Sequence, residues 1–288
     1  MNAFLVNLIR VIPDKYYLSL LYFRYFKRIL NWKSPRNFSE KLQWLKVYDR
    51  NPEYTKMVDK YAVKEYVERK IGKQYVIPTL GIWDSVDEID YDILPNQFVL
   101  KTTHGGGGGG VVICKDKSKF NKEMARKRLL QSMNADIYKT LREWPYKNVK
   151  KCIIAEQYME DDNGELNDYK FSCFNGYVND VMVCIDRQLH DAKFYFFDRN
   201  WKLLPLNVRG KAASVDFTLP EPACIGEMFE IASKLSKGLP YVRVDLYAIK
   251  GKAYFGEITF YPQSGFDKNL LPEAEKFYGD LIHLPDKR

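Results

Sequence analysis

The chain has 288 residues, of which 46% are hydrophobic and 28% are charged, so it is long and apolar enough to bury a core as a globular protein. Its 45 lysines and arginines outnumber 37 acidic residues and give a net charge of +8, which favours a polyanionic partner. The basic residues are spread along the chain and form no recognisable nucleic-acid-binding module, so nucleic acid is not the expected partner. Nucleotide phosphates, an acidic polysaccharide and an anionic membrane surface all suit the charge.

Cysteine and histidine usage excludes two kinds of metal site. The five cysteines are scattered and form no CxxC pair, and three histidines are present in all. A zinc site or a histidine-based metal cluster is therefore not expected, whereas buried free thiols in a reducing cytosol are. We accordingly expect a cytoplasmic protein.

The first apolar stretch of the chain is interrupted by Arg10, Asp14 and Lys15, so it is too short to span a membrane. It also lacks the pattern of a signal peptide. Residues 16–32 mix aromatic and basic side chains. We expect them to form a helix packed on the domain, with a position on a membrane surface as the alternative.

Residues 1–55 as a whole have helical patterns. Residues 39–48 have apolar side chains at helical spacing behind a Ser39 cap. Residues 59–69 predict a second helix that ends near Gly72. The following residues, 76–83, favour a strand or an extended segment.

A glycine loop between two strands is the most informative local pattern. Residues 96–103 predict a strand, six glycines follow at positions 105–110, and residues 111–114 predict another strand. Glycine amides can close over a phosphate chain, and Lys101 on the entering strand can meet the same phosphates. A Walker A loop is excluded because no Gly-Lys-Ser/Thr and no helix follow. The alternative is an exposed loop without a ligand.

The rest of the chain alternates between helical and strand patterns. A basic helix is predicted over residues 118–140, and a strand over 149–159 leads into an acidic loop at 160–164. Residues 168–174, 176–185 and 193–197 predict strands. A helix from Pro222 to Gly238 has proline early and glycine just past its end. No internal repeat and no long linker are present.

A β-hairpin over residues 241–259 turns at Lys250-Gly251 and organises the candidate site. Arg243 and Asp245 share one face of the first arm, and Glu257 and Thr259 share one face of the second. An odd-length loop at residues 249–251 would bring all four side chains to one face, with Asp245 and Glu257 as diagonal neighbours that bind one divalent cation. An even-length loop would separate them, and a solvated charged face is the alternative.

Five motifs in order resemble the ATP-grasp enzymes, and within them the TupA-like branch of teichuronopeptide and surface-polysaccharide biosynthesis. They span residues 37–285 and read Met57-Val-Asp-Lys-Tyr-Ala-Val-Lys64, Phe98-Val-Leu-Lys-Thr-Thr-His-Gly105, Ile154-Ala-Glu-Gln-Tyr-Met159, Asp168-Tyr-Lys-Phe171, and the hairpin pair Arg243-Val-Asp245 with Glu257-Ile-Thr259. The resemblance implies an α+β, ATP-grasp fold in which two subdomains hold ATP between antiparallel sheets. We expect a helical segment over residues 1–55 and an ATP-grasp domain over 56–288, divided near residue 150.

The resemblance also implies roles for individual residues. The adenine is expected at the hinge, with Glu156 accepting from its amino group, Gln157 beside it and the Met159 backbone at the ring edge. Asp168 is favoured for the ribose over Glu160 or Asp161. Phosphate ligands are expected to be Lys60, Lys101, Lys170 and the amides of the glycine loop, among them Gly105, Gly106, Gly107 and Gly108. His104 is expected either to touch phosphate or substrate or to be a packed loop histidine.

The hairpin and the turn after it are expected to carry the chemistry. Asp245 and Glu257 would hold Mg²⁺, with Thr259 where the family usually has asparagine, and a threonine hydroxyl is a poorer ligand than an amide oxygen. Arg243 would stabilise the developing oxyanion, with backbone donors from Ser264 and Gly265. No side-chain nucleophile is needed.

The implied activity is that of a Mg-ATP-dependent carboxylate–amine ligase that works through an acyl phosphate. Its expected substrates are an amino acid or amine and the carboxylate of a uronic-acid-type sugar or lipid-linked saccharide, used in capsule or surface-polysaccharide assembly at the inner membrane face. The alternatives are a sugar kinase on the same fold and a non-catalytic or glycosyltransferase-associated polysaccharide-binding protein. Because residues 1–55 are too short for the substrate-binding βαβ domain that often precedes this fold, substrate recognition is expected from the N-terminal helices or from residues 187–190.

Overall fold

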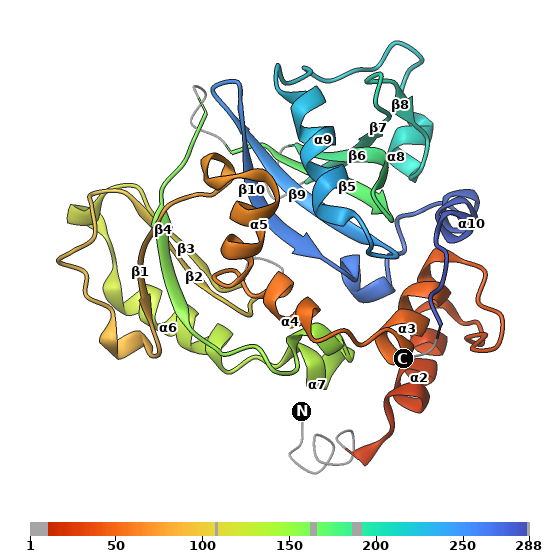
Figure 1. Ribbon diagram of the computed structural model, residues 1–288, viewed down its shortest axis with the longest axis horizontal. Helices are drawn as coiled ribbons and strands as arrows, with labels where there is room; N and C mark the ends of the chain where they lie inside the picture. The colour runs from red at the N-terminus through yellow and green to blue at the C-terminus, as the bar shows by residue number, and fades with distance from the viewer. Residues whose placement is uncertain (1–10, 107–108, 162–165, 186–191, 287–288) are drawn as a thin grey trace.

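The computed structural model describes residues 11–106, 109–161, 166–185 and 192–286. Gly107, Gly108 and the expected substrate-recognition region at residues 187–190 lie outside the described residues. The fold is α+β, as predicted, and its strands form two antiparallel sheets that face each other across helices α4 and α5 (Figure 1).

A four-stranded sheet forms one half of the fold, in the spatial order β1-β4-β2-β3. Its strands are β1 (Thr79–Trp83), β2 (Phe98–Thr102), β3 (Val111–Cys114) and β4 (Ile153–Gln157). Side chains alternate along β2, so Phe98 and Leu100 are buried on one face, where they join Leu129 of α6 (Lys122–Met133) in a core cluster. A short helix, α7 (Ile137–Leu141), follows α6. Strand β4 pairs with β1 and β2, so the chain passes to the other sheet after Gln157. The expected division of the domain near residue 150 stays a prediction.

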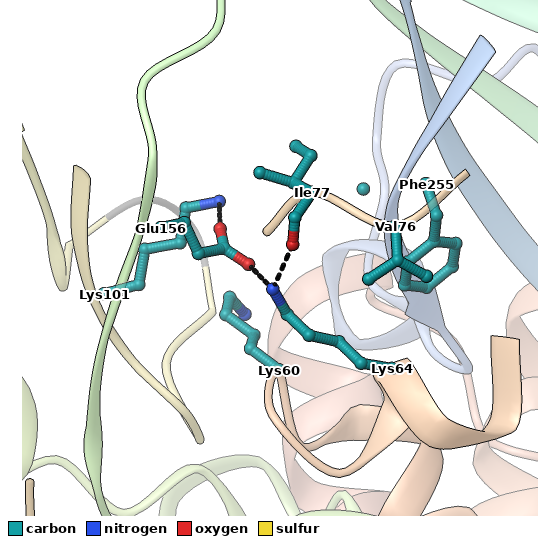
Figure 2. A pocket seen from close by; sticks show the side chains of 8 residues that line it. Lys60, Lys64, Val76, Ile77, Lys101, Glu156 and Phe255 are labelled. Atoms are coloured by element: carbon teal, nitrogen blue, oxygen red, sulfur yellow. Dashed lines mark hydrogen bonds and ion pairs between the residues drawn. The ribbon is translucent and has the colours of Figure 1, made fainter. Parts of the chain in front are cut away.

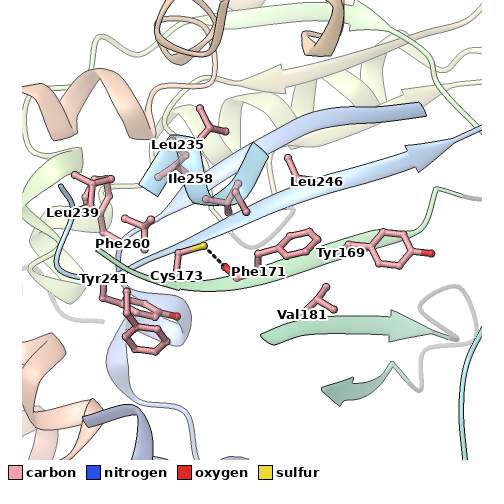
Figure 3. Packing of buried hydrophobic residues seen from close by; sticks show 14 of the residues in the cluster. Tyr169, Phe171, Cys173, Val181, Leu235, Leu239, Tyr241, Leu246, Ile258 and Phe260 are labelled. Atoms are coloured by element: carbon pink, nitrogen blue, oxygen red, sulfur yellow. Dashed lines mark hydrogen bonds between the residues drawn. The ribbon is translucent and has the colours of Figure 1, made fainter. Parts of the chain in front are cut away.

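A six-stranded sheet forms the other half, in the order β10-β9-β5-β6-β7-β8. Its strands are β5 (Asp168–Phe174), β6 (Tyr177–Ile185), β7 (Lys193–Phe197), β8 (Leu203–Leu204), β9 (Val242–Ile249) and β10 (Lys252–Thr259). All seven residues of β5 are buried, as expected of an inner strand. Helix α9 (Ile225–Ser236) covers one face, where the rings of Phe229 and Phe171 pack edge to face with their centroids 5.1 Å apart. Phe171 lies among the packed side chains of this core (Figure 3).

The N-terminal helices are α2 (Asp14–Phe26), α3 (Phe38–Tyr48), α4 (Glu53–Val58) and α5 (Val63–Ile71). Among the described residues 11–55 the predicted helical patterns do form helices, but the Ser39 cap is wrong. Asn37 caps α3, and the Glu40 carboxylate accepts from the Asn37 amide at 3.1 Å, which is a capping box. The Ser39 hydroxyl instead donates at 2.7 Å to Glu275 of α10 (Pro272–Leu281). Phe38 and Leu42 of α3 belong to the same core cluster as the six-stranded sheet.

The second predicted helix begins later than expected. The Asp59 side chain accepts from the amides of Tyr61 and Ala62, so a turn precedes α5, which ends at Gly72 (φ 110°) as predicted. Sequence reasoning missed α10, β8 and α8 (Val208–Ala212). All five cysteines are buried and free, as predicted. None of the helices in the described residues has the length and apolar character needed to cross a membrane.

Candidate active site

The hairpin β9–β10 brings the four predicted polar residues to one face, but through a different turn and strand pairing from those predicted. Its turn has two residues, Lys250 (φ 50°) and Gly251 (φ 74°), so the expected odd-length loop is wrong. Pairing runs from Phe255 with Leu246 directly to Glu257 with Asp245, and Gly256 is a β-bulge. The extra residue compensates for the even turn, and Asp245 and Glu257 lie directly opposite each other instead of diagonally.

Gly256 suits the bulge because the backbones approach closely there. A β-carbon on Gly256 would lie 2.9 Å from the backbone oxygen of Asp245 and 3.1 Å from the Tyr247 ring. A larger residue would therefore push β10 away from β9. The bulge that aligns Glu257 with Asp245 thus depends on this glycine.

Arg243 connects the polar residues of this face. Its Nε and Nη2 donate to the two oxygens of Asp245 at 2.6 and 2.8 Å. The same Nη2 lies 3.4 Å from Glu257 and 3.3 Å from the Thr259 hydroxyl, and that hydroxyl donates to Glu257 at 3.2 Å. The predicted grouping of these four residues on one face is therefore present.

Two residues of the neighbouring strand β5 complete this cluster. Lys170 pairs with Asp245 across the strands, and its Nζ forms ion pairs with Asp245 and, at 2.5 Å, with Asp168. All three side chains are buried. Although burial alone lowers the pKa of Lys170, Asp245 and Asp168 raise it, so the ammonium stays charged. The roles of Lys170 at phosphate and of Asp168 at the ribose stay predictions.

Glu257 differs from Asp245 in its exposure. The side chain of Glu257 is 38% exposed, whereas that of Asp245 is 2% exposed. The partial burial of Glu257 raises its pKa, but the positive charges of Lys60 and Arg243 outweigh this effect and lower the pKa to about 2. Glu257 is therefore an ionised carboxylate that a ligand can reach.

Lys60 joins this face to the glycine loop of the other sheet. Its Nζ lies 3.5 Å from Glu257 and donates to the carbonyl of Gly105 at 2.5 Å. Its amide also donates to the carbonyl of Thr103 at 2.9 Å. The segment after β2 and the hairpin therefore meet at one side chain, as a shared phosphate and cation site requires.

A second lysine cluster surrounds Glu156 on β4 (Figure 2). Lys64 and Lys101 each approach one oxygen of this buried carboxylate at 2.5 Å. Burial alone raises the pKa of Glu156, but Lys101 and Lys64 outweigh this effect and lower the pKa below its ordinary value. The carboxylate is therefore ionised. A pocket here is lined by Lys60, Lys64, Val76, Ile77, Lys101, Glu156, Phe255 and Gly256. Sequence reasoning gave Lys64 no role, although this lysine ends the first motif and lies four residues after Lys60.

The remaining hinge residues have ordinary environments. Glu156 pairs with two lysines here, and its contact with adenine stays a prediction. The Gln157 amide donates to the Pro78 carbonyl at 3.0 Å while its side chain is exposed, and Met159 is half-buried. Their roles at adenine likewise stay predictions.

His104 packs in the loop beside the glycines. Its side chain is buried, and its Nε2 lies 3.1 Å from the Ser132 carbonyl. Burial and then Lys151 lower its pKa, so the ring is neutral near pH 7. This environment matches the packed-histidine alternative, and contact with phosphate stays a prediction. Gly105 and Gly106 lie in the described part of the loop, and a β-carbon on Gly105 would lie 2.4 Å from the Thr102 hydroxyl.

The turn after β10 is fixed by a buried lysine that sequence reasoning missed. Lys46 of α3 is fully buried, and its Nζ donates to the Ser264 carbonyl at 2.8 Å and the Ser264 hydroxyl at 2.7 Å. It also donates to the Leu141 carbonyl at 3.0 Å. Burial lowers the pKa of Lys46 to about 7, against the opposing effect of Glu143, which is also buried.

This network occupies part of the predicted oxyanion turn. The Ser264 amide donates to the Tyr261 carbonyl at 2.7 Å, and Gln43 donates to the carbonyls of Ser264 and Gly265. Ser264 has a φ of 55°, an uncommon value for serine, which these contacts maintain. A role for Ser264 and Gly265 as backbone donors stays a prediction.

The oxygen atoms on the hairpin fit a magnesium ion chemically. Mg²⁺ is usually bound through one or two carboxylates, with water and phosphate oxygens completing its six positions. Asp245, Glu257 and the Thr259 hydroxyl supply that kind of ligand on one face. Among the described residues there is no group of three or more His, Cys, Asp or Glu that could enclose a metal by itself, so a bound phosphate would have to share it.

A family model described as TupA-like ATPgrasp matches residues 40–283. The chain belongs to the TupA-like ATP-grasp family. The expected resemblance to the TupA-like branch of the ATP-grasp enzymes is thus confirmed. A search of curated proteins found no match.

The comparison with solved structures gives partial matches to several ligases. D-alanine–D-alanine ligase from Bacillus anthracis is 20% identical with a TM-score of 0.44, and the match covers 78% of this chain and 64% of that one. L-amino acid ligase from Bacillus licheniformis is 13% identical with a TM-score of 0.46, covering 86% and 55%. The ATP-grasp ligase PsnB, solved with Mg and ADP, is 11% identical with a TM-score of 0.45, covering 84% and 65%. The TupA-like chain spans less than two thirds of each of these proteins.

Proposed function

We propose that this TupA-like protein is a cytoplasmic, Mg-ATP-dependent carboxylate–amine ligase. The observation that carries the proposal is the pairing of Asp245 with Glu257 on one face of the hairpin, within reach of Lys60. Because Lys60 also contacts Gly105, the carboxylates suited to a cation lie beside the loop suited to phosphate.

The lysines around the pocket account for binding of a polyanion. Lys60, Lys64 and Lys101 bring three positive charges to one pocket, and Glu156 holds the last two in place. Asp245 and Glu257 would hold Mg²⁺, which would offset the negative charge of the phosphates during transfer. Adenine would lie at the hinge, near residues 156–159.

The reaction balances without a nucleophilic side chain. A carboxylate oxygen of the acceptor bonds to the γ-phosphorus of ATP, the bond from that phosphorus to the β–γ bridging oxygen breaks, and ADP leaves. The amine nitrogen then attacks the acyl carbon, the carbon–oxygen bond to phosphate breaks, and an amide, phosphate and a proton result. Arg243 would stabilise the oxyanion of this second step, assisted by backbone groups at Ser264 and Gly265.

The substrates are proposed from charge and family. The chain carries a net charge of +8, which suits a uronic-acid-type sugar or a lipid-linked acidic saccharide. The amine would be an amino acid or another small amine. Membership in the TupA-like family supports a place in teichuronopeptide, capsule or related surface-polysaccharide synthesis.

The test measures how much ADP the full chain forms from Mg-ATP when it is given each pair of a uronic acid and an amino acid. Mass spectrometry then identifies the products. We expect ADP release that requires both substrates, and a product smaller by one water than their sum. Asp245→Asn should abolish it. A stable phosphosugar formed without amine would identify a kinase instead, and the absence of ATP binding would favour a non-catalytic protein.

A further inference from the structure

Helix α2 has apolar side chains on two opposite faces, and among the described residues only one of these faces is buried. Leu18 and Tyr22 are fully buried and pack with Leu30 and Phe266. On the other side, Tyr16, Leu20 and Phe23 are 66%, 62% and 53% exposed. These three follow the spacing i, i+4, i+7, so they form one continuous stripe along the outside of the helix.

The exposed charged side chains of this segment all have one sign. Within residues 11–36 the exposed charged side chains are Lys15, Arg24, Lys27, Arg28, Lys33 and Arg36, all of which are basic. The acidic residue of this segment, Asp14, is half-buried and paired with Arg50 and Arg142. Ile29, 87% exposed, extends the apolar surface beyond the end of the helix. An apolar stripe bordered by cations is the pattern of a helix lying at an anionic lipid surface.

We propose that the outer face of α2 binds an anionic membrane surface, with Tyr16, Leu20 and Phe23 entering the lipid interface and the basic residues contacting lipid phosphates. The helix lies at the periphery of the fold, so a flat surface can reach it (Figure 1). An acidic polysaccharide or nucleic acid would use the basic residues and leave the apolar stripe uncovered. The membrane accounts for both features at once.

The same helix connects this surface to the candidate active site. Tyr25 of α2 stacks on Phe266 at 4.6 Å, and Phe266 directly follows the Ser264–Gly265 turn. If the proposed function holds, membrane binding would bring that turn close to a lipid-linked substrate. The docking surface itself does not rest on the proposed function, and its test needs no enzyme activity.

The experiment is flotation of the full chain with vesicles of phosphatidylcholine alone and of phosphatidylcholine with phosphatidylglycerol. We expect binding to the anionic vesicles only. Leu20→Asn combined with Phe23→Asn should weaken it about tenfold or more. A matched control is Ile93→Asn with Phe277→Asn, which changes side chains 61% and 44% exposed elsewhere and should bind like the wild type.

Several outcomes would overturn the proposal. Equal binding to neutral and anionic vesicles would show that the basic residues play no part. A loss of binding in the control variant would show that the effect is not specific to this face. Binding that falls with Arg24→Gln and Arg28→Gln yet is unchanged by Leu20→Asn with Phe23→Asn would indicate a general polyanion surface. A lower melting temperature of the Leu20/Phe23 variant without vesicles would show that the chain itself already covers the stripe. A change from dimer to monomer would show that a second copy of the chain covers it.

Discussion

Replacement of Glu156 by glutamine tests whether the lysine pocket is held together by one carboxylate. Each oxygen of Glu156 lies 2.5 Å from a lysine nitrogen, and the side chains of Glu156, Lys64 and Lys101 are 7%, 12% and 18% exposed. Glutamine keeps the shape but removes the negative charge. Two ammonium groups then face each other with little water between them.

The expected cost follows from that burial. Breaking a buried ion pair by removing one partner typically costs about 3–5 kcal/mol. Because both lysines retain some access to water, we expect the lower end, about 3 kcal/mol. For a chain of this size this corresponds to a fall in melting temperature of roughly 6–12 °C. Mg-ATP should raise the melting temperature of the variant more than that of the wild type, because its phosphates supply the missing charge.

Urea and thermal unfolding followed by circular dichroism measure both effects. Glu230→Gln is the matched control, since its pair with Arg199 is more than half exposed and is expected to contribute about 1 kcal/mol or less. A free energy of unfolding for Glu156→Gln within about 1 kcal/mol of the wild type would refute the argument. So would a smaller ATP-induced shift in the variant than in the wild type.

Three further predictions concern the hairpin and the turn after it. Lys46→Met should lower the free energy of unfolding in urea by about 3 kcal/mol or more, because it leaves buried Glu143 and the Ser264 carbonyl without their cation. An unchanged free energy of unfolding would contradict this role of Lys46. Gly256→Ala should cost about 1–3 kcal/mol and weaken Mg-ATP binding in calorimetry, whereas Gly226→Ala, whose β-carbon meets nothing, should be neutral or stabilising. The pKa of Glu257 is about 2 in the folded state against 4.5 ordinarily, so the folded state binds fewer protons than the unfolded state between these values. Acidification from pH 5 through this window should therefore reduce wild-type stability more than that of Glu257→Gln, and parallel pH curves would show that the shift is absent.

Residues near each other in the sequence could be predicted well. The strands on either side of the glycine loop, the hairpin and the ends of β5 and β7 follow from local patterns of glycine and β-branched or aromatic residues. The shared face of Asp245 and Glu257 was predicted through a loop that does not exist. A glycine inside a strand often marks a bulge, so Gly256 was the signal that would have given the right reason.

Contacts between distant segments could not be predicted from local patterns. Lys46, Glu143 and Ser264 come from three separated parts of the chain, and their meeting depends on how α3 packs against the turn after β10. The sequence held one indirect signal, since Lys46 lies four residues after buried Leu42 on the inner face of α3. The capping box at Asn37 and Glu40 was also readable, and choosing Ser39 overlooked it.

Calorimetric titration of ATP into the full chain, with Mg²⁺ and then with a chelator, tests the central claim most directly. If Asp245 and Glu257 hold the cation that carries the nucleotide, the wild type binds ATP much more tightly with Mg²⁺. A variant with Asp245→Asn and Glu257→Gln should lose that difference while it remains folded. Equal ATP affinity with and without Mg²⁺ in the wild type, or an undiminished Mg²⁺ effect in the variant, would contradict the account.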